Sequence, residues 1–351
     1  MTDLRDIVAA ASSAPSAHNT QPWDARIRSD AIELGVAEGR TLRVGDPTGR
    51  DTVLALGAWT EAAVAAARAR GRALDVQILP ALADPAVIVR AERRDPVARL
   101  ALGGEVPVQR TALDRRLTYR GAVRRVPGFL EAASAVVPPW IRLVPIAAGD
   151  LRRLSALGTA DTLTRPGVAE ELASWLRLSP QHPRYDLDGL SDRVLLLPPH
   201  LAALAAPFTR RRRLRDGAAR VARIGGDLVR RVLLEVPVQA AGEAADADHF
   251  VLVVESDELD LGTGAALTRI LNSPLGLPAE TVFEAGRALM RVWLLAAERG
   301  IAFAPHSEVL DSALAQGELQ YRLGLGRRAV PLFVTSAGRP MAVPPRSPRL
   351  G

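Results

Sequence analysis

The sequence predicts an α+β fold in which one unit, an antiparallel-rich sheet flanked by helices, occurs twice in the chain. Two echoes appear in the same order. Residues 57–71 (GAWTEAAVAAARARG) resemble residues 286–300 (GRALMRVWLLAAERG), and residues 8–27 resemble residues 129–143. In the second pair, an alanine-rich helix leads through proline to tryptophan and an arginine-bearing strand. Repetition in a fixed order favours duplication, and chance resemblance between alanine-rich helices is the alternative.

The first half is expected to contain both helices and strands. A short helix over 3–12 precedes two strands within 23–37, with a turn near Ser29. The segment 46–71 begins as a loop and continues as a long helix. Further strands are expected at 74–80 and 86–93, and helical spacing returns over 96–121.

The chain divides near residue 108, into a first half of 1–108 and a longer second half of 109–351. The extra length lies at about 160–245, and we expect this insert to form a lid over the core. Long helices at 52–70 and 281–299 are expected to pair, which would make the halves a pseudo-dimer within one chain. The second of these helices is apolar nearly all round, as a buried interface helix should be.

Composition places the chain among globular proteins. It has 351 residues, of which 48% are apolar, and no cysteine, so disulfides and thiolate metal sites are excluded. The N-terminus lacks the layout of a signal peptide. The longest apolar stretch, 194–208, is too short to span a bilayer and contains adjacent prolines. We therefore expect a cytoplasmic protein with no membrane partner.

The net charge is +6, and all 45 basic residues are arginine. An excess of arginine and alanine is typical of a GC-rich genome, so the charge alone does not indicate nucleic-acid binding. Arginines concentrate at 210–231, where they could bind nucleic acid or an anionic membrane. Few aromatics for base stacking lie nearby. A solvated lid helix is the preferred interpretation, and binding of an anionic substrate or a nicotinamide phosphate is a third.

The segment RRLTYR (115–120) is a candidate phosphate site. Arg116, Thr118 and Arg120 alternate, so in an extended segment their side chains point the same way. Two guanidinium groups that flank a hydroxyl can hold a phosphate. A solvated basic turn is the alternative. The histidines show no metal-ligand spacing, so no metal site is expected; they are His18, His182, His200, His249 and His306.

The stretch APSAHNTQPW (14–23) resembles the N-terminal signature of FMN-dependent nitroreductases, Pro-Ser-x-x-Asn-x-Gln-Pro-Trp. RRLTYR resembles the phosphate motif of that family, Arg-x-Ser-x-Arg, with threonine for serine. The segment 39–59 resembles a "DPxGR…GA" segment of the Acg-like branch, in which two nitroreductase halves are fused in one chain. Two further segments resemble the loop along the flavin edge and the terminal strand, respectively 300–309 and 321–331.

The two halves keep complementary parts of the site that this resemblance implies. The first half has the Pro-Ser-x-x-Asn loop but no arginine motif before it. The second half has RRLTYR, but its loop is reduced to VVPPW (136–140). The resemblance thus implies one complete FMN site and one degenerate site per chain, and a chain that is monomeric because it carries its own pseudo-dimer.

The resemblance also implies roles for single residues. Arg116, Thr118 and Arg120 would hold the phosphate and ribityl end, with Arg115 beside them. The backbone N–H groups of Ser307 and Glu308 would face N5 and O4 of the flavin, where a donor stabilises the reduced ring. Other expected members of the site are Pro15, Ser16 and Asn19 along the ring, Arg327 or Arg328 at the phosphate, and His306 and His18 near the flavin.

The chain departs from the family pattern at two places. Ala122 stands where an aromatic residue is expected, and Ser307-Glu308 replaces a region in which glycine is usual. Ser307 and Glu308 have bulkier side chains than glycine, so they and the insert could narrow access to the flavin.

The function implied is an oxidoreductase that passes hydride through flavin N5, with NAD(P)H as a possible donor. The acceptor would be a small molecule: a nitro compound, a quinone or a biosynthetic intermediate. One alternative is a protein that sequesters FMN beneath a closed lid without turnover. Another is an anion-binding module with a vestigial flavin site. For the oxidoreductase, which is the preferred interpretation, no nucleic-acid partner is expected.

Overall fold

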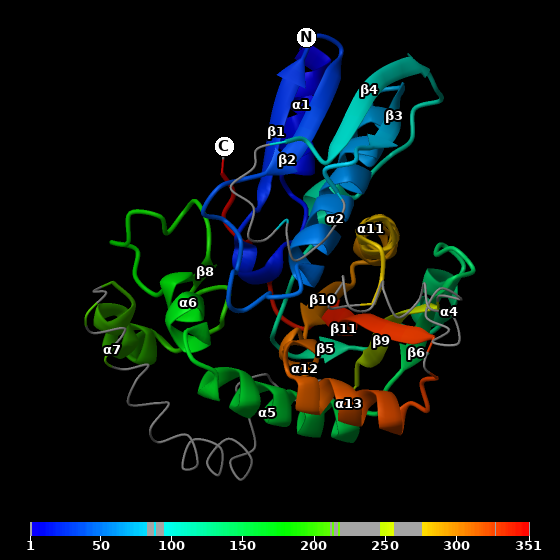
Figure 1. Ribbon diagram of the computed structural model, residues 1–351. Helices are drawn as coiled ribbons and strands as arrows, with labels where there is room; N and C mark the ends of the chain where they lie inside the picture. Colours follow the sequence, from blue (N-terminus) through cyan, green and yellow to red (C-terminus); the bar gives the residue numbers. More distant parts are fainter. Residues whose placement is uncertain are drawn as a thin grey trace.

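The computed structural model describes residues 2–82, 88, 95–210, 213, 217, 246–255, 276–326 and 328–350. Two antiparallel sheets lie on opposite sides of a pair of long helices (Figure 1). The first sheet has four strands in the order β1-β2-β4-β3, and the main path of the second is β10-β11-β9-β6. The mixture of helices and antiparallel strands confirms the α+β class.

The first sheet is built from the N-terminal part of the chain. The hairpin β1–β2 turns between Arg28 and Ala31, and the long helix that follows begins after Gly49, whose φ of 71° suits glycine. The carboxylate of Asp46 accepts hydrogen bonds from the backbone N–H groups of Asp51 and Thr52 and so caps this helix. The elements are α1 (Thr2–Ala11), η1 (Ala17–Asn19), β1 (Trp23–Arg28), β2 (Ala31–Val36), α2 (Arg50–Arg68), β3 (Arg72–Ile78) and β4 (Ala98–Glu105).

The helical spacing predicted over 96–121 is wrong. Residues 98–105 form β4, an inner strand that pairs with β2 on one side and β3 on the other. Ala98 and Leu100 are fully buried while Arg99 is exposed, so the alternation of a strand decides the local structure. The strand expected at 86–93 lies outside the described residues, except for Ile88, which is helical.

The second sheet has helices on both faces. Phe250, Leu252 and Val254 of β9 pack toward α4 and α11, and Val251 and Val253 pack toward α5, α12 and α13. The elements are η2 (Leu113–Arg115), β5 (Val123–Arg124), α4 (Phe129–Ser134), β6 (Ile141–Pro145), α5 (Ala148–Thr164), α6 (Val168–Ser174), β7 (Leu176–Arg177), β8 (Leu190–Ser191), α7 (Pro199–Arg210), β9 (Asp248–Glu255), α11 (Ala279–Glu298), β10 (Ala302–Pro305), α12 (Glu308–Asp311), α13 (Ala313–Arg322) and β11 (Ala329–Pro340).

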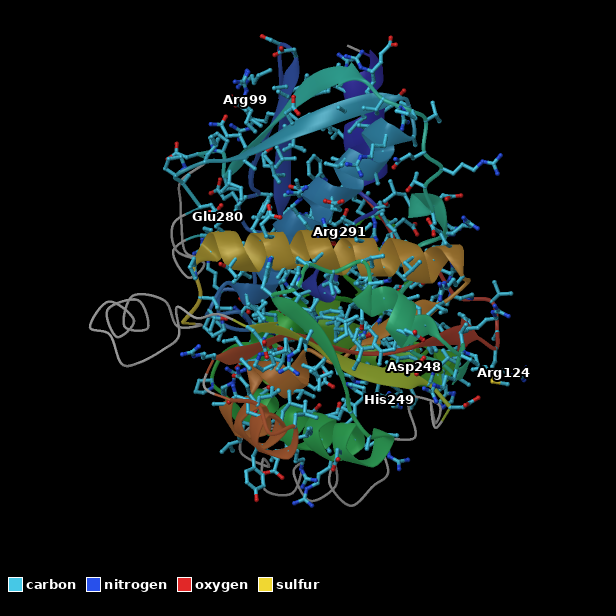
Figure 2. All side chains as sticks on the ribbon, turned by 90° about the vertical axis from the view of Figure 1, so that its right-hand side faces the viewer. Arg99, Arg124, Asp248, His249, Glu280 and Arg291 are labelled. Carbon is cyan, nitrogen blue, oxygen red and sulfur yellow. The ribbon has the colours of Figure 1, made fainter. Side chains whose placement is uncertain are left out.

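The helices α2 and α11 cross in near backbone contact, as the sequence leads one to expect. A Cβ atom added at Gly57 would lie 2.0 Å from the carbonyl oxygen of Phe283, and one added at Gly286 would lie 2.3 Å from that of Leu54. Only glycine permits this approach. Figure 2 shows α11 lying between the part of the chain that carries the first sheet and the part that carries the second.

The stretch expected to form a lid has two different environments. It begins in the last turn of α5, a helix that packs against α12 and α13 in the second half. The segment from α6 onward contacts the first half, where Glu171 accepts hydrogen bonds from the backbone N–H groups of Val44 and Gly45. Most of the arginines at 210–231 lie outside the described residues. Within the described chain, no helix has the length and apolar character needed to cross a membrane.

Candidate functional site

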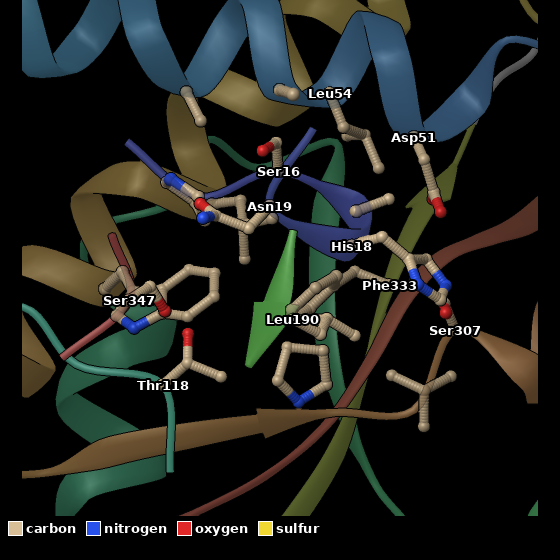
Figure 3. A pocket seen from close by; sticks show the side chains of 18 of the residues that line it. Ser16, His18, Asn19, Asp51, Leu54, Thr118, Leu190, Ser307, Phe333 and Ser347 are labelled. Atoms are coloured by element: carbon tan, nitrogen blue, oxygen red, sulfur yellow. The ribbon is translucent and has the colours of Figure 1, made fainter. Parts of the chain in front are cut away.

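A cavity of about 290 Å³ lies where both halves, the insert and the C-terminal tail meet (Figure 3). Ligand pockets measure roughly 300–1,000 Å³, so this one is near the lower limit. The first half contributes Pro15, Ser16, Ala17, His18 and Asn19 from the opening loop and Arg50, Asp51, Leu54, Ala55 and Ala58 from α2. The insert contributes Leu190, Val194 and Leu195, and the C-terminal tail contributes Ser347 and Arg349. The rest of the second half contributes Arg116, Thr118 and Arg120, Leu289 and Trp293 of α11, Pro305, Ser307, Glu308 and Leu310, and Leu332, Phe333 and Val334 of β11.

The loop of the opening motif has an unusual backbone. His18, Asn19 and Gln21 have φ values of 48°, 53° and 53°, in the left-handed region that side chains disfavour. Such residues cost about 1–3 kcal/mol each and persist where surrounding contacts fix them. Gln21 is fully buried, and its side chain donates a 2.9 Å hydrogen bond to the carbonyl oxygen of Leu187 in the insert. Gln21 therefore has a structural role, because it joins the opening loop to the insert.

Arg116 is a buried cation at the cavity. Its side chain is close to fully buried, its Nε donates a 2.9 Å hydrogen bond to the carbonyl oxygen of Ser13, and its guanidinium lies 5.0 Å from the ring centre of Trp293. Among the described residues, its buried Nη1 has no hydrogen-bond partner. Burial, followed by repulsion from Arg349, holds the pKa of Arg116 well below its usual value. A buried guanidinium with no carboxylate partner indicates a site for an anion.

The C-terminal tail supplies a second cation that the sequence analysis missed. Arg349 donates to the carbonyl oxygen of Ser13 at 3.2 Å and to the side-chain oxygen of Asn19, and burial lowers its pKa to about 10. The tail is held by Leu350, whose N–H donates to Gln21 at 2.9 Å. The segment PPRSPRL (344–350) has no helical or strand periodicity that could have placed it here.

Arg120 has different charged neighbours from Arg116. The backbone between them runs beside β10, where the N–H of Tyr119 donates a 2.9 Å hydrogen bond to the carbonyl oxygen of Phe303. Nη1 of Arg120 is also buried, and it has no partner in the part of the chain that the structure describes. Burial lowers the pKa of Arg120, and the nearby charge of Glu308 opposes this effect. Arg116 and Arg120 therefore both belong to the cavity wall, Arg116 beside Arg349 and Arg120 on the side of Glu308, and among the described residues each has one buried Nη1 without a partner.

The remaining predicted site residues divide into two groups. Pro15, Ser16, Asn19, Thr118, Ser307 and Glu308 line the cavity. Outside the cavity wall lie Arg115 and Arg328, which are exposed, and His306, which lies behind Glu308; Arg327 is outside the described residues.

His18 also lines the cavity, beside Asp51 and Ser307 (Figure 3). Its Nδ1 is buried without a partner. Burial and the charge of Arg120 lower the pKa of His18 to about 4, so the imidazole is neutral near pH 7. Among the described residues, no three His, Asp or Glu side chains are grouped so that they could hold a metal ion.

The insert is fastened to the opening loop beside the cavity. The fully buried carboxylate of Asp188 pairs with Arg177 at 2.9 Å, with Arg40 at 3.2 Å and with Arg184. Burial alone would raise the pKa of Asp188, but hydrogen bonds from Arg184 and Arg177 outweigh it and the pKa is lowered. The next residue, Gly189, accepts a hydrogen bond from the side chain of Asn19 at 3.3 Å. The insert therefore forms a fixed wall of the cavity.

Comparison with known proteins gives partial matches. The chain is 33% identical over 176 residues to "Putative NAD(P)H nitroreductase MT3217" and to "Putative NAD(P)H nitroreductase Rv3131", from two strains of Mycobacterium tuberculosis. The matched residues are 49% of this chain and 50% of each relative. No family model matches the chain. The chain thus spans about half the length of the curated relatives it matches, and over that half it is similar to proteins named as nitroreductases.

Proposed function

We propose that the protein is an FMN-dependent oxidoreductase of the nitroreductase type, in which two fused halves of the Acg-like branch build one flavin site per monomer. The observation that carries this proposal is the pair of buried, unpartnered guanidinium donors of Arg116 and Arg120 at a cavity between the halves. The nitroreductase names of the relatives support the reaction class. The halves, 1–108 and 109–351, would be the two members of the pseudo-dimer.

The residues present fit FMN in charge and in polarity. Arg116 and Arg349 are buried cations whose repulsion a phosphate would relieve, with the hydroxyl groups of Thr118 and Ser347 in the same wall. Leu54, Leu289 and Phe333 offer an apolar surface for a planar ring. When bound, FMN supplies two-electron transfer between a nicotinamide donor and a small-molecule acceptor. The chain's residues bind and orient the partners, and the insert excludes water.

A second candidate function is FMN sequestration without turnover. The fixed wall made by the insert favours it, because Leu190, Val194 and Leu195 line the cavity and Asp188 fastens their segment to Arg40 of the first half. A cavity closed in this way would retain the flavin but deny access to a nicotinamide.

The visible spectrum of the FMN-loaded protein under anaerobic NADPH separates the two functions. We expect the flavin absorbance to bleach, because the oxidoreductase must admit its donor. Persistence of the oxidised spectrum would contradict turnover with a nicotinamide and favour sequestration. Arg40→Gln removes the contact between the first half and Asp188, so faster bleaching in this variant would identify the insert as the barrier. The exposed neighbour variant Arg43→Gln is the control and should match the unmodified protein.

A further inference from the structure

A line of hydrogen-bonded side chains crosses the second sheet. His249 of β9 and Ser336 of β11 are paired in register, and Nδ1 of His249 lies 2.8 Å from Oγ of Ser336. On its other side the same Oγ lies 2.9 Å from Nε2 of His306, which directly follows β10. Figure 2 marks His249 in the part of the molecule that carries the second sheet. The line therefore connects three strands through side chains alone.

The line ends at the wall of the cavity. Nδ1 of His306 lies 3.3 Å from Oε1 of Glu308, which also accepts a hydrogen bond from the hydroxyl of Ser155 on α5. Glu308 lines the cavity, and its charge influences the pKa of both Arg120 and His18 across it. Asp311 on the same helix is a further charged neighbour. One carboxylate thus connects the cavity with the interior line of histidines.

The chemistry of the groups gives the line a direction. A serine hydroxyl has one hydrogen, so between two imidazole nitrogens Ser336 must accept from one and donate to the other. Each imidazole can in turn hold a proton on one nitrogen and release one from the other. The same sheet face is otherwise built from Val251, Val253 and Val334, which are buried apolar residues. Polar side chains in such a position are retained only when they are bonded to one another.

We propose that Glu308 delivers protons to an acceptor bound in the cavity and that His306, Ser336 and His249 resupply it. This inference rests on the proposed function. Two-electron reduction of a quinone needs one hydride, which bound FMN would supply, and one proton. The Nδ1–H bond of His306 breaks as an O–H bond forms on the Glu308 carboxylate, and that O–H bond breaks as one forms on the product oxygen, which completes the hydroquinone. The Ser336 hydroxyl gives its proton to Nε2 of His306 and takes one from Nδ1 of His249, and water supplies the proton that His249 regains.

The resting state agrees with this order of events. Burial alone would raise the pKa of Glu308, but the contacts with His306 and Ser155 outweigh it and hold the pKa below its usual value. Glu308 therefore rests as a carboxylate and carries the proton only in passing. A general acid in place contributes on the order of 100-fold to 10,000-fold in rate, so loss of the carboxyl should be clearly measurable.

The test compares Ser336→Ala and Glu308→Gln with Thr335→Val, which alters the neighbouring buried hydroxyl. We expect kcat for a quinone acceptor to fall about tenfold in Ser336→Ala and about 100-fold in Glu308→Gln, with KM unchanged and Thr335→Val unaffected. Ser336→Thr keeps the hydroxyl and should restore kcat. A second readout needs no cofactor: with five histidines in the chain, NMR can follow each imidazole, and Ser336→Ala should remove the one protected ring N–H signal whose hydrogen bond Ser336 accepts.

The outcomes separate this inference from the proposed function. If the unmodified protein bleaches with NADPH while Ser336→Ala and Glu308→Gln keep the unmodified kcat, the relay is overturned and the oxidoreductase stands. If Ser336→Ala loses kcat and the ring N–H signal but Ser336→Thr keeps both, the relay is supported. If the unmodified protein binds no FMN, the proposed function fails and the relay fails with it.

Discussion

Replacing Arg116 by methionine is expected to weaken FMN binding at least about 30-fold, equivalent to about 2 kcal/mol at 1.4 kcal/mol per tenfold. The guanidinium is buried at the cavity with Nη1 unpartnered, so a bound phosphate would be its counter-ion in a site with little water. Quenching of FMN fluorescence during titration measures the change. Methionine keeps much of the apolar length that packs against Trp293, which limits the substitution to a loss of charge.

The neighbouring arginine provides the matched control. Arg115 is exposed and outside the cavity wall, so Arg115→Met should change FMN affinity less than twofold. Stability gives an independent reading. Arg116 is costly to bury without an anion, so Arg116→Met should leave the Tm of cofactor-free protein unchanged or raise it. Equal losses of affinity in both variants, or none in either, would contradict the assignment of Arg116 to the phosphate.

Gly286→Ala is expected to destabilise the protein by about 3 kcal/mol, at the upper end of overpacking effects. The added methyl would lie 2.3 Å from the carbonyl oxygen of Leu54, and neither helix backbone can rotate away as a side chain would. Gly57→Ala, which places a methyl 2.0 Å from the carbonyl oxygen of Phe283, should have a similar effect. Chemical denaturation measures both changes in the free energy of unfolding.

A third glycine supplies a control of opposite sign. Gly317 lies in α13 with nothing within 4 Å of an added Cβ atom. Gly317→Ala should stabilise the protein by about 0.5–1 kcal/mol, because alanine loses less backbone entropy in a helix. If Gly286→Ala were as harmless as Gly317→Ala, the close crossing of α2 and α11 would be wrong, and with it the way the two sheets are joined.

Local patterns predicted most of the first half but not β4, one of the two inner strands of the first sheet. The β1–β2 hairpin and α2 follow from alternation, capping and glycine, which act within a few residues. The strand β4 was missed because its apolar residues also fit helical spacing. Ala98 and Leu100 are buried between β2 and β3, and these neighbours decide between the two periods. Tertiary pairing of this kind is invisible in a window of ten residues.

The candidate site was predictable where a motif carried it. The opening loop and the alternating residues Arg116, Thr118 and Arg120 all reach the cavity. Arg349 could not be found, because the tail is extended and owes its position to Asn19 and Gln21, which are more than 300 residues away. The wall made by Leu190 depends likewise on contacts with the opening loop.

The number of FMN molecules bound per chain tests the central claim most directly. Under the proposed function the two halves together build one complete site, and the described cavity lined by Arg116 and Arg120 is where it would lie. Titration of the purified 351-residue chain, followed by flavin absorbance and by the mass of the complex, gives the ratio. The account predicts one FMN per chain in a monomer. No retained flavin, or two per chain, would contradict it.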